Sequence, residues 1–127
     1  KYPNISLVDY IYDMPVRMVA ADLVICRSGA STLSELAATS KPSILIPSPN
    51  VTNNQQYKNA KLLADMGAAV LIDDDKLTPD LLAEAVDGII SDREKLTGMQ
   101  TAAGRFAVKD TESIIFENLM SIVKNKK

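Results

Sequence analysis

The sequence predicts an α/β fold in which a parallel sheet carries helices on both faces. Short apolar runs of strand length alternate with longer segments of helical period, and short loops join them. The runs at 23–26, 43–46 and 68–72 are almost wholly apolar, which is typical of parallel strands buried on both faces. The first of these runs passes through Ser28-Gly29 directly into a helical pattern. We therefore expect one Rossmann-like domain.

The expected elements begin with a strand at residues 5–11, where β-branched and aromatic side chains are mixed. Asp13 as an N-cap and Pro15 in the first turn predict a short helix that reaches Ala21. The three apolar runs supply the remaining strands. The further expected helices are about 30–39, from the loop at 50–56 to residue 66, 79–90, 93–106 and 111–124.

Two helix ends carry specific signals. Gly67 follows the helix that ends at Met66 and is its natural C-terminal cap. Thr78 followed by Pro79 is typical of a helix start, because the threonine hydroxyl caps and proline fits the first helical position. The expected inward face of that helix consists of Leu81, Leu82, Ala85, Val86, Ile89 and Ile90.

Composition excludes several functions. Apolar residues make up 46% and charged residues 24% of the 127 positions, which is ordinary for a globular domain. No apolar run approaches the roughly 20 residues of a membrane-spanning helix. The net charge of −2 argues against nucleic acid as a partner, because binding to phosphates needs a basic face.

Residue types restrict the chemistry further. The sequence has no histidine, so neither a Ser-His-Asp triad nor an imidazole metal site is expected. Cys26 is the single cysteine and lies in an apolar strand, which favours a core thiol over a nucleophile. Asp73, Asp74 and Asp75 are adjacent carboxylates of the kind found in solvated turns, so we expect no metal and no cofactor.

The turn at Ser28-Gly29 predicts an anion site. A helix that begins there directs the unpaired N–H groups of Ala30, Ser31 and Thr32 into the crevice at the carboxyl end of the strand, where phosphate is favoured. The alternative is an ordinary strand-to-helix turn in which Ser28 caps the helix without a ligand.

A carboxylate and an amide-rich loop complete the predicted site. Glu35 lies one turn after the helix start, on the side expected to face the crevice. The loop at 50–56 ends in Gln55 and Gln56, and amides suit sugar hydroxyls because they both donate and accept hydrogen bonds. The alternative for this loop is a polar surface segment with a helix cap.

Taken in order, these features resemble the carboxyl-terminal half of the MurG family of GT-B glycosyltransferases, which transfer N-acetylglucosamine from its UDP-sugar onto lipid I. The loop Pro49-Asn50-Val51-Thr52-Asn53-Asn54 is similar to Gram-positive members. The motifs that carry the resemblance are Asp9-Tyr10-Ile11-Tyr12-Asp13-Met14, Ala21-Asp22-Leu23-Val24-Ile25-Cys26-Arg27-Ser28-Gly29-Ala30, Ser34-Glu35 and Asn53-Asn54-Gln55-Gln56-Tyr57-Lys58-Asn59-Ala60.

The resemblance implies a role for each site residue. The backbone of Ile11 would meet the uracil edge, and Glu35 would accept hydrogen bonds from the ribose hydroxyls. The helix start would hold the diphosphate. The sugar hydroxyls would meet Gln56 and Gln55, with Asn59 close behind. The residues implied to bind UDP-N-acetylglucosamine are therefore Ile11, Ser28, Gly29, Ala30, Ser31, Thr32, Glu35, Gln55, Gln56 and Asn59.

The resemblance also implies what residues 1–127 lack. They would form a partial donor-binding domain without the amino-terminal acceptor domain, the catalytic base and the first strand with its Gly-Gly-Ser turn. We expect such a fragment to be inactive alone and, through its bare edge strand and last helix, prone to non-native dimerisation. The complete enzyme would lie on the cytoplasmic side of the bacterial membrane as a peripheral protein.

Two alternatives remain at this point. One is the donor domain of another UDP-sugar glycosyltransferase, such as a diacylglycerol glucosyltransferase or a two-subunit enzyme. The other is a non-catalytic regulatory or assembly domain in which Glu35 and the amide loop are merely surface. Protection against heat by UDP, as opposed to ADP, would separate the first class from the second.

Overall fold

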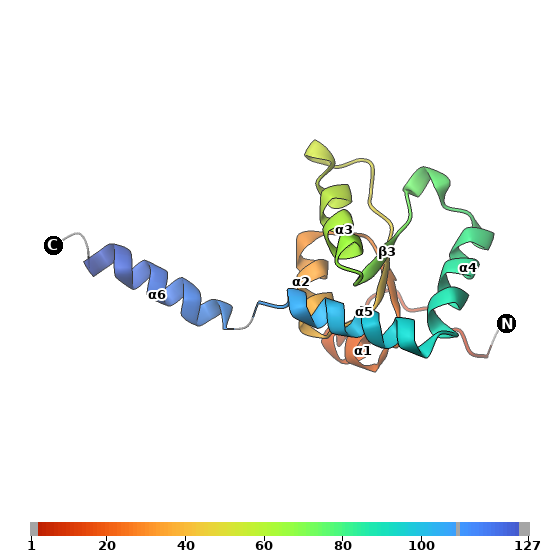
Figure 1. Cartoon of the computed structure of the whole chain (residues 1–127), viewed down its shortest axis with the longest axis horizontal. Coiled ribbons are helices and arrows are strands. Elements are labelled where there is room, and N and C mark those ends of the chain that lie inside the picture. The colour runs from red at the N-terminus through yellow and green to blue at the C-terminus, as the bar shows by residue number, and fades with distance from the viewer. Residues whose placement is uncertain (1–2, 109, 125–127) are drawn as a thin grey trace.

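The computed structural model describes residues 3–108 and 110–124 and places a small parallel sheet at the centre of the domain (Figure 1). Its three strands are β1 (Val24–Cys26), β2 (Ser43–Leu45) and β3 (Ala69–Leu71), in the order β1-β2-β3. Both pairs are parallel, with Ile25 opposite Ile44 and Ile44 opposite Val70. The three predicted apolar strands are therefore confirmed, each one or two residues shorter than predicted.

Six α-helices surround or follow the sheet among the described residues. Their positions confirm the sequence predictions to within one or two residues at the ends that were predicted. The helices are α1 (Met14–Ala20), α2 (Ala30–Ala38), α3 (Gln55–Asp65), α4 (Pro79–Ile90), α5 (Arg93–Phe106) and α6 (Thr111–Lys124), with short 3-10 helices η1 (Thr52–Asn54) and η2 (Asp74–Lys76).

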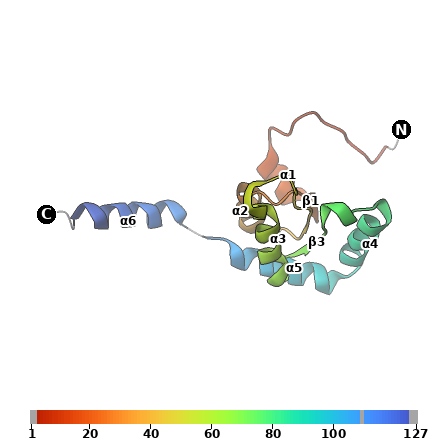
Figure 2. The ribbon, with the colours of Figure 1, turned by 90° about the horizontal axis from the view of Figure 1, so that it is seen from above.

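The core lies on both faces of the sheet, as predicted. Because side chains alternate along a strand, Leu45 of β2 faces one side and Ile44 the other. Leu45 packs in a cluster with α2 and α3, whereas Ile44 packs with α4. Helix α5 serves both clusters, through Ala103 on the first and Met99 on the second. Figures 1 and 2 show α2 and α3 on one side of the sheet and α4 on the other.

The predicted strand at residues 5–11 is wrong. This segment has no regular secondary structure and leaves Leu7 and Tyr10 95% and 69% exposed. A strand forms only against a hydrogen-bonding neighbour, and the sheet of the described residues pairs β1 with β2 alone and β2 with β3. The β-branched and aromatic composition of residues 5–11 is thus not sufficient by itself to form a strand. In Figure 2 the segment arcs outside the helices before it joins α1.

The two specific helix ends are confirmed. Thr78 precedes α4 and its hydroxyl accepts a hydrogen bond from the N–H of Leu81 at 3.1 Å. Gly67 lies beyond the end of α3 with a φ of +75°, a left-handed conformation that favours glycine. The predicted inward face of α4 is correct at Ile89, which is buried, and at Leu82, Ala85 and Val86, which pack against the same cluster. It is wrong at Leu81 and Ile90, which are 37% and 47% exposed.

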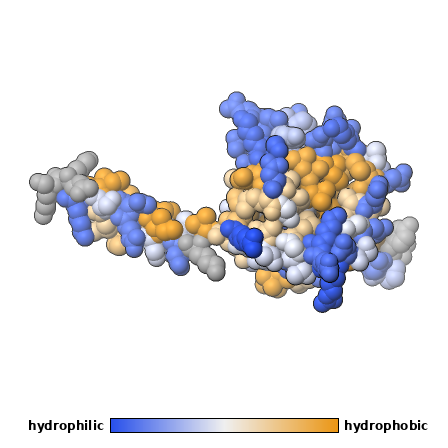
Figure 3. All heavy atoms as spheres, in the orientation of Figure 1, coloured by the Kyte–Doolittle hydropathy of each residue, from blue (hydrophilic) through white to orange (hydrophobic). Residues whose placement is uncertain are grey.

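Helix α6 extends away from the domain (Figure 1). All of its side chains are exposed, including Phe116 and Leu119, and Figure 3 shows its apolar residues along the surface. This confirms the expected bare apolar surface on the last helix. Across the described part of the chain, no helix has both the length and the hydrophobicity to cross a bilayer.

Candidate functional site

The start of α2 lies at the carboxyl end of β1 and offers free backbone donors. The N–H of Leu33 makes the first bond of the helix, to the carbonyl of Gly29 at 3.0 Å. The N–H groups of Ala30, Ser31 and Thr32 precede that bond, and no side chain of the N-cap residue satisfies them. Three donors at the positive end of a helix dipole form a suitable environment for an anion.

Gly29, and not Ser28, is the N-cap residue of α2. Its φ and ψ of −66° and 151° are open to any residue, so the turn does not require glycine for its backbone conformation. A Cβ atom at this position would meet only Thr32 Oγ1, at 3.9 Å. The glycine is therefore not needed for the backbone conformation of the turn, and its lack of a side chain leaves the space above the first turn of α2 open.

Ile11 and Glu35 line one cavity of about 470 Å³. The residues that line it are Val8, Asp9, Tyr10, Ile11, Met14 and Glu35. Glu35 is exposed on α2, one turn after the free donors, as predicted. The volume is within the roughly 300–1,000 Å³ of small-molecule sites. Two residues 24 positions apart in the sequence are thus brought to the same hollow.

Ser28 is directed inward. It is completely buried, and its hydroxyl donates a hydrogen bond to the backbone carbonyl of Gln56 at 2.8 Å. The capping alternative considered from the sequence is wrong, because this hydroxyl is committed to α3 and not to the donors of α2. Because the whole residue is buried, Ser28 has no surface with which to touch a ligand, and the ligand contact that the resemblance implies for it is not seen.

The side-chain amides predicted to bind the sugar form hydrogen bonds within the protein. Gln55 Nε2 donates to Asn59 Oδ1 at 3.0 Å, and Asn59 Nδ2 donates to the carbonyl of Ser28 at 3.1 Å. Gln56 Oε1 accepts from the N–H of Ser48 at 2.9 Å. The start of α3 is therefore fastened to the turn before α2 and to the loop after β2, and these amides are close together as predicted.

Two other amides of the loop have a conformational reason to be there. Asn53 and Asn54 adopt left-handed φ angles of +57° and +52°. Asparagine tolerates this conformation better than most residues, since its short polar side chain can bond locally. The polar-loop alternative therefore accounts for this part of the amide-rich sequence.

Arg27 is a residue of the site region that the sequence reasoning missed. Its Nη1 donates to the carbonyls of Ile46 and Pro47 at 3.1 and 3.3 Å and forms an ion pair with Asp74. It thereby joins the carboxyl ends of β1, β2 and β3. A lone arginine directly after an apolar strand was the available signal, because a cation at that point faces the carbonyl-rich ends of the neighbouring strands.

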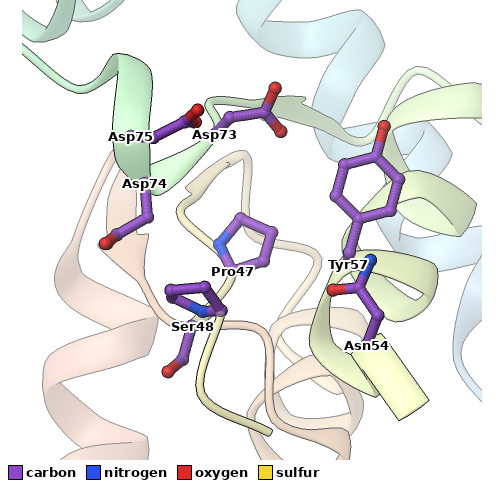
Figure 4. A pocket seen from close by; sticks show the side chains of 8 residues that line it. Pro47, Ser48, Asn54, Tyr57, Asp73, Asp74 and Asp75 are labelled. Carbon is purple, nitrogen blue, oxygen red and sulfur yellow. The ribbon is translucent and has the colours of Figure 1, made fainter.

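The three aspartates border a second hollow of about 440 Å³, beside Pro47 and Tyr57 (Figure 4). Asp74 pairs with Arg27, and Asp73 pairs with Lys76 at 2.7 Å. The hydrogen bond that Lys76 donates to Asp73 raises the pKa of Lys76. Two of the three carboxylates are thus paired with basic side chains, which agrees with the expected solvated turn.

The comparison with known families decides the chain's relationship. The model of the glycosyltransferase family 28 C-terminal domain matches residues 1–115. This chain belongs to that family. The family 28 match extends over β1 to β3 and α1 to α5, and so covers every element that borders the two hollows.

Two relatives of this family 28 chain bear the same enzyme name. In Acetivibrio thermocellus, a UDP-N-acetylglucosamine--N-acetylmuramyl-(pentapeptide) pyrophosphoryl-undecaprenol N-acetylglucosamine transferase is 47% identical over 99% of this chain and 34% of that protein. A second transferase of this name, from Bacillus thuringiensis (strain Al Hakam), is 41% identical over 95% of this chain and 33% of that protein. The chain therefore spans about a third of the length of these relatives.

Solved structures agree with this relationship. The crystal structure of Acinetobacter baumannii MurG superimposes with a TM-score of 0.84 at 30% identity, over 91% of this chain and 35% of that one. The glycotransferase of kitacinnamycin gives a TM-score of 0.69 at 24% identity, over 91% of this chain and 30% of that one, which shows a shared fold. The MurG resemblance and the α/β class expected from the sequence are both confirmed.

Proposed function

We propose that this chain is the donor-binding part of an inverting hexosyltransferase and that it binds UDP-N-acetylglucosamine. The observation that carries the proposal is the hollow shared by Ile11 and Glu35, with Glu35 one turn along α2 from the three free N–H groups. A uridine diphosphate has a flat base, a diol and an anion in that order. The chain offers a backbone edge, a carboxylate and a helix N-terminus in the same order.

Each group has a chemical task in this proposal. Carboxylate oxygens accept hydrogen bonds from both hydroxyls of a ribose, so Glu35 selects the nucleoside. The N–H groups of Ala30, Ser31 and Thr32 hold the diphosphate and stabilise the charge that grows on it as the glycosidic bond breaks. Oriented dipoles supply this stabilisation without a metal ion.

The sugar is assigned to the start of α3. Gln56 Oε1 is committed to Ser48, so the amide nitrogen of Gln56 is the group that meets a hydroxyl. Gln55 is exposed at the first position of α3, and its Oε1 is the remaining acceptor on that side. Both lie on the element that is fastened to the diphosphate turn, which keeps sugar and diphosphate sites in one rigid unit.

The whole reaction extends beyond this chain. The names of the relatives indicate that the acceptor is the undecaprenyl-linked N-acetylmuramyl-pentapeptide known as lipid I. A general base must take the proton of the acceptor hydroxyl, and we assign that base and most acceptor contacts to the part of the relatives outside the matched third. The complete enzyme would then work at the cytoplasmic face of the bacterial membrane as a peripheral protein in peptidoglycan synthesis.

Calorimetric titration of UDP into the chain tests the donor site. We expect Glu35→Ala to weaken UDP binding by about 1–3 kcal/mol, the range for loss of a charged hydrogen bond. The control is Glu84→Ala, which removes an exposed glutamate on α4, remote from the site. ADP is the control nucleotide, since an assembly domain would show no preference for UDP. Equal binding of UDP by the wild type and Glu35→Ala would refute the assignment of Glu35.

A further inference from the structure

Two hydrogen bonds join the turn before α2 to the start of α3, and two more support them; we name this set of four the Ser28–Asn59 clasp. The hydroxyl of Ser28 donates to the carbonyl of Gln56, while the carbonyl of Ser28 accepts from Asn59 Nδ2, at 2.8 and 3.1 Å. Gln55 Nε2 orients Asn59 through its Oδ1 at 3.0 Å, and Gln56 Oε1 extends the set to the N–H of Ser48. Ser28 thus has both its side chain and its backbone carbonyl bonded to one helix.

The clasp acts on the residue next to the N-cap of α2. Ser28 immediately precedes Gly29, whose carbonyl accepts the first bond of that helix. Gly29 is the N-cap residue and has no side chain, so no side-chain hydrogen bond from this position fixes the start of α2. The position of the free N–H groups therefore depends on how firmly Ser28 is held.

From this geometry we infer that Asn59 and Ser28 are positioning residues, which set the α2 N-terminus in the place where it binds the diphosphate. Asn59 acts through the carbonyl of Ser28 and not by touching the sugar. The inference rests on the proposed function and refines it, because the resemblance to relatives implies a place for Asn59 beside the sugar.

The two roles differ in a measurable way. If Asn59 contacts the sugar, Asn59→Ala weakens the binding of UDP-N-acetylglucosamine and leaves UDP unchanged. If Asn59 positions α2, the same substitution weakens both ligands by the same factor, since both carry the diphosphate. Uridine has no phosphate, so its affinity should not change, whereas general loss of structure would weaken uridine as well.

The experiment compares these three ligands on the 127-residue chain, with calorimetry for UDP and UDP-N-acetylglucosamine and NMR titration for uridine. We expect Asn59→Ala to weaken both nucleotides about five- to tenfold, the effect of losing one buried hydrogen bond. Lys58→Ala, an exposed neighbour on α3, is the matched control and should bind like the wild type. Thermal unfolding confirms that each variant is folded at the titration temperature.

Two further variants keep the test decisive if Asn59→Ala unfolds. Gln55→Ala removes the outer support of Asn59 from an exposed position. UDP has no sugar for Gln55 to meet, so its expected weakening of about twofold reports the effect on Asn59 alone. Ser28→Ala removes the hydroxyl of the clasp. Combined with Gln55→Ala, it should weaken UDP by less than the product of the single effects, because both act on the same turn.

The outcomes separate the two proposals. UDP binding that is unchanged in Asn59→Ala, with UDP-N-acetylglucosamine weakened, overturns the clasp inference and leaves the donor site in place. Equal weakening of both nucleotides with unchanged uridine supports the inference. A folded wild-type chain that binds neither nucleotide overturns the proposed function and the clasp together.

Discussion

Gly29→Ala should leave the thermal stability of the chain almost unchanged while it weakens the binding of UDP. The backbone angles of Gly29 suit alanine, and the added Cβ would meet only Thr32 Oγ1 at 3.9 Å, an ordinary contact. Loss of flexibility in the unfolded chain stabilises such a variant by about 0.4–1 kcal/mol. Alanine is a poorer N-cap than glycine by a similar amount, roughly 0.5–1 kcal/mol. The two effects nearly cancel, so we expect Tm to change by about 2 °C or less.

Binding should respond quite differently. The methyl group of Gly29→Ala would occupy the open space above the first turn of α2, where the proposed diphosphate approaches the N–H groups. Each hydrogen bond to a charged group contributes about 1.5–3 kcal/mol, so displacement from one donor weakens UDP at least tenfold. The assay is calorimetric titration of UDP combined with thermal unfolding of the same preparation.

Gly98→Ala is the matched control for this substitution. Gly98 lies inside α5, and a Cβ there would meet nothing within 4 Å. Alanine is the better helix former by about 0.5–1 kcal/mol, so Tm should rise while UDP binding stays unchanged. Wild-type affinity for UDP in Gly29→Ala would refute the placement of the diphosphate at α2. A large fall in Tm would instead show that the fold itself requires the glycine.

Two further predictions concern stability and reactivity. Thr78→Ala removes the hydroxyl that caps α4 and should lower the free energy of unfolding by about 1 kcal/mol in urea unfolding; Thr78→Ser keeps the hydroxyl and should be close to the wild type. Burial raises the pKa of Cys26 from 9.0 to about 11, so its thiol should react slowly with iodoacetamide at pH 8. Rapid alkylation of the folded chain would contradict this slow reaction. Because the pKa of the thiol is higher in the folded chain than in the unfolded chain, the stability of the wild type relative to Cys26→Ser should be full below pH 9 and fall as the pH rises through about 11.

Local sequence signals predicted most elements because those signals act over a few residues. Helix starts and ends depend on a cap such as Thr78 or a glycine such as Gly67, and both behave as predicted. Central strands depend on continuous apolar runs, and all three are present. The strand at 5–11 failed because pairing requires a neighbour, which no local composition reveals.

The features of the candidate site also fall into those that local sequence predicts and those that depend on tertiary contacts. The sequence by itself determined the α/β order, the helix start after Ser28-Gly29 and the carboxylate one turn beyond it, since these follow from spacing along a single helix. Only the tertiary structure decided that Ser28 faces α3, that Asn59 holds its carbonyl and that Arg27 joins three strand ends. These bonds connect residues 19 to 47 positions apart, so they depend on how the layers pack and not on any local pattern.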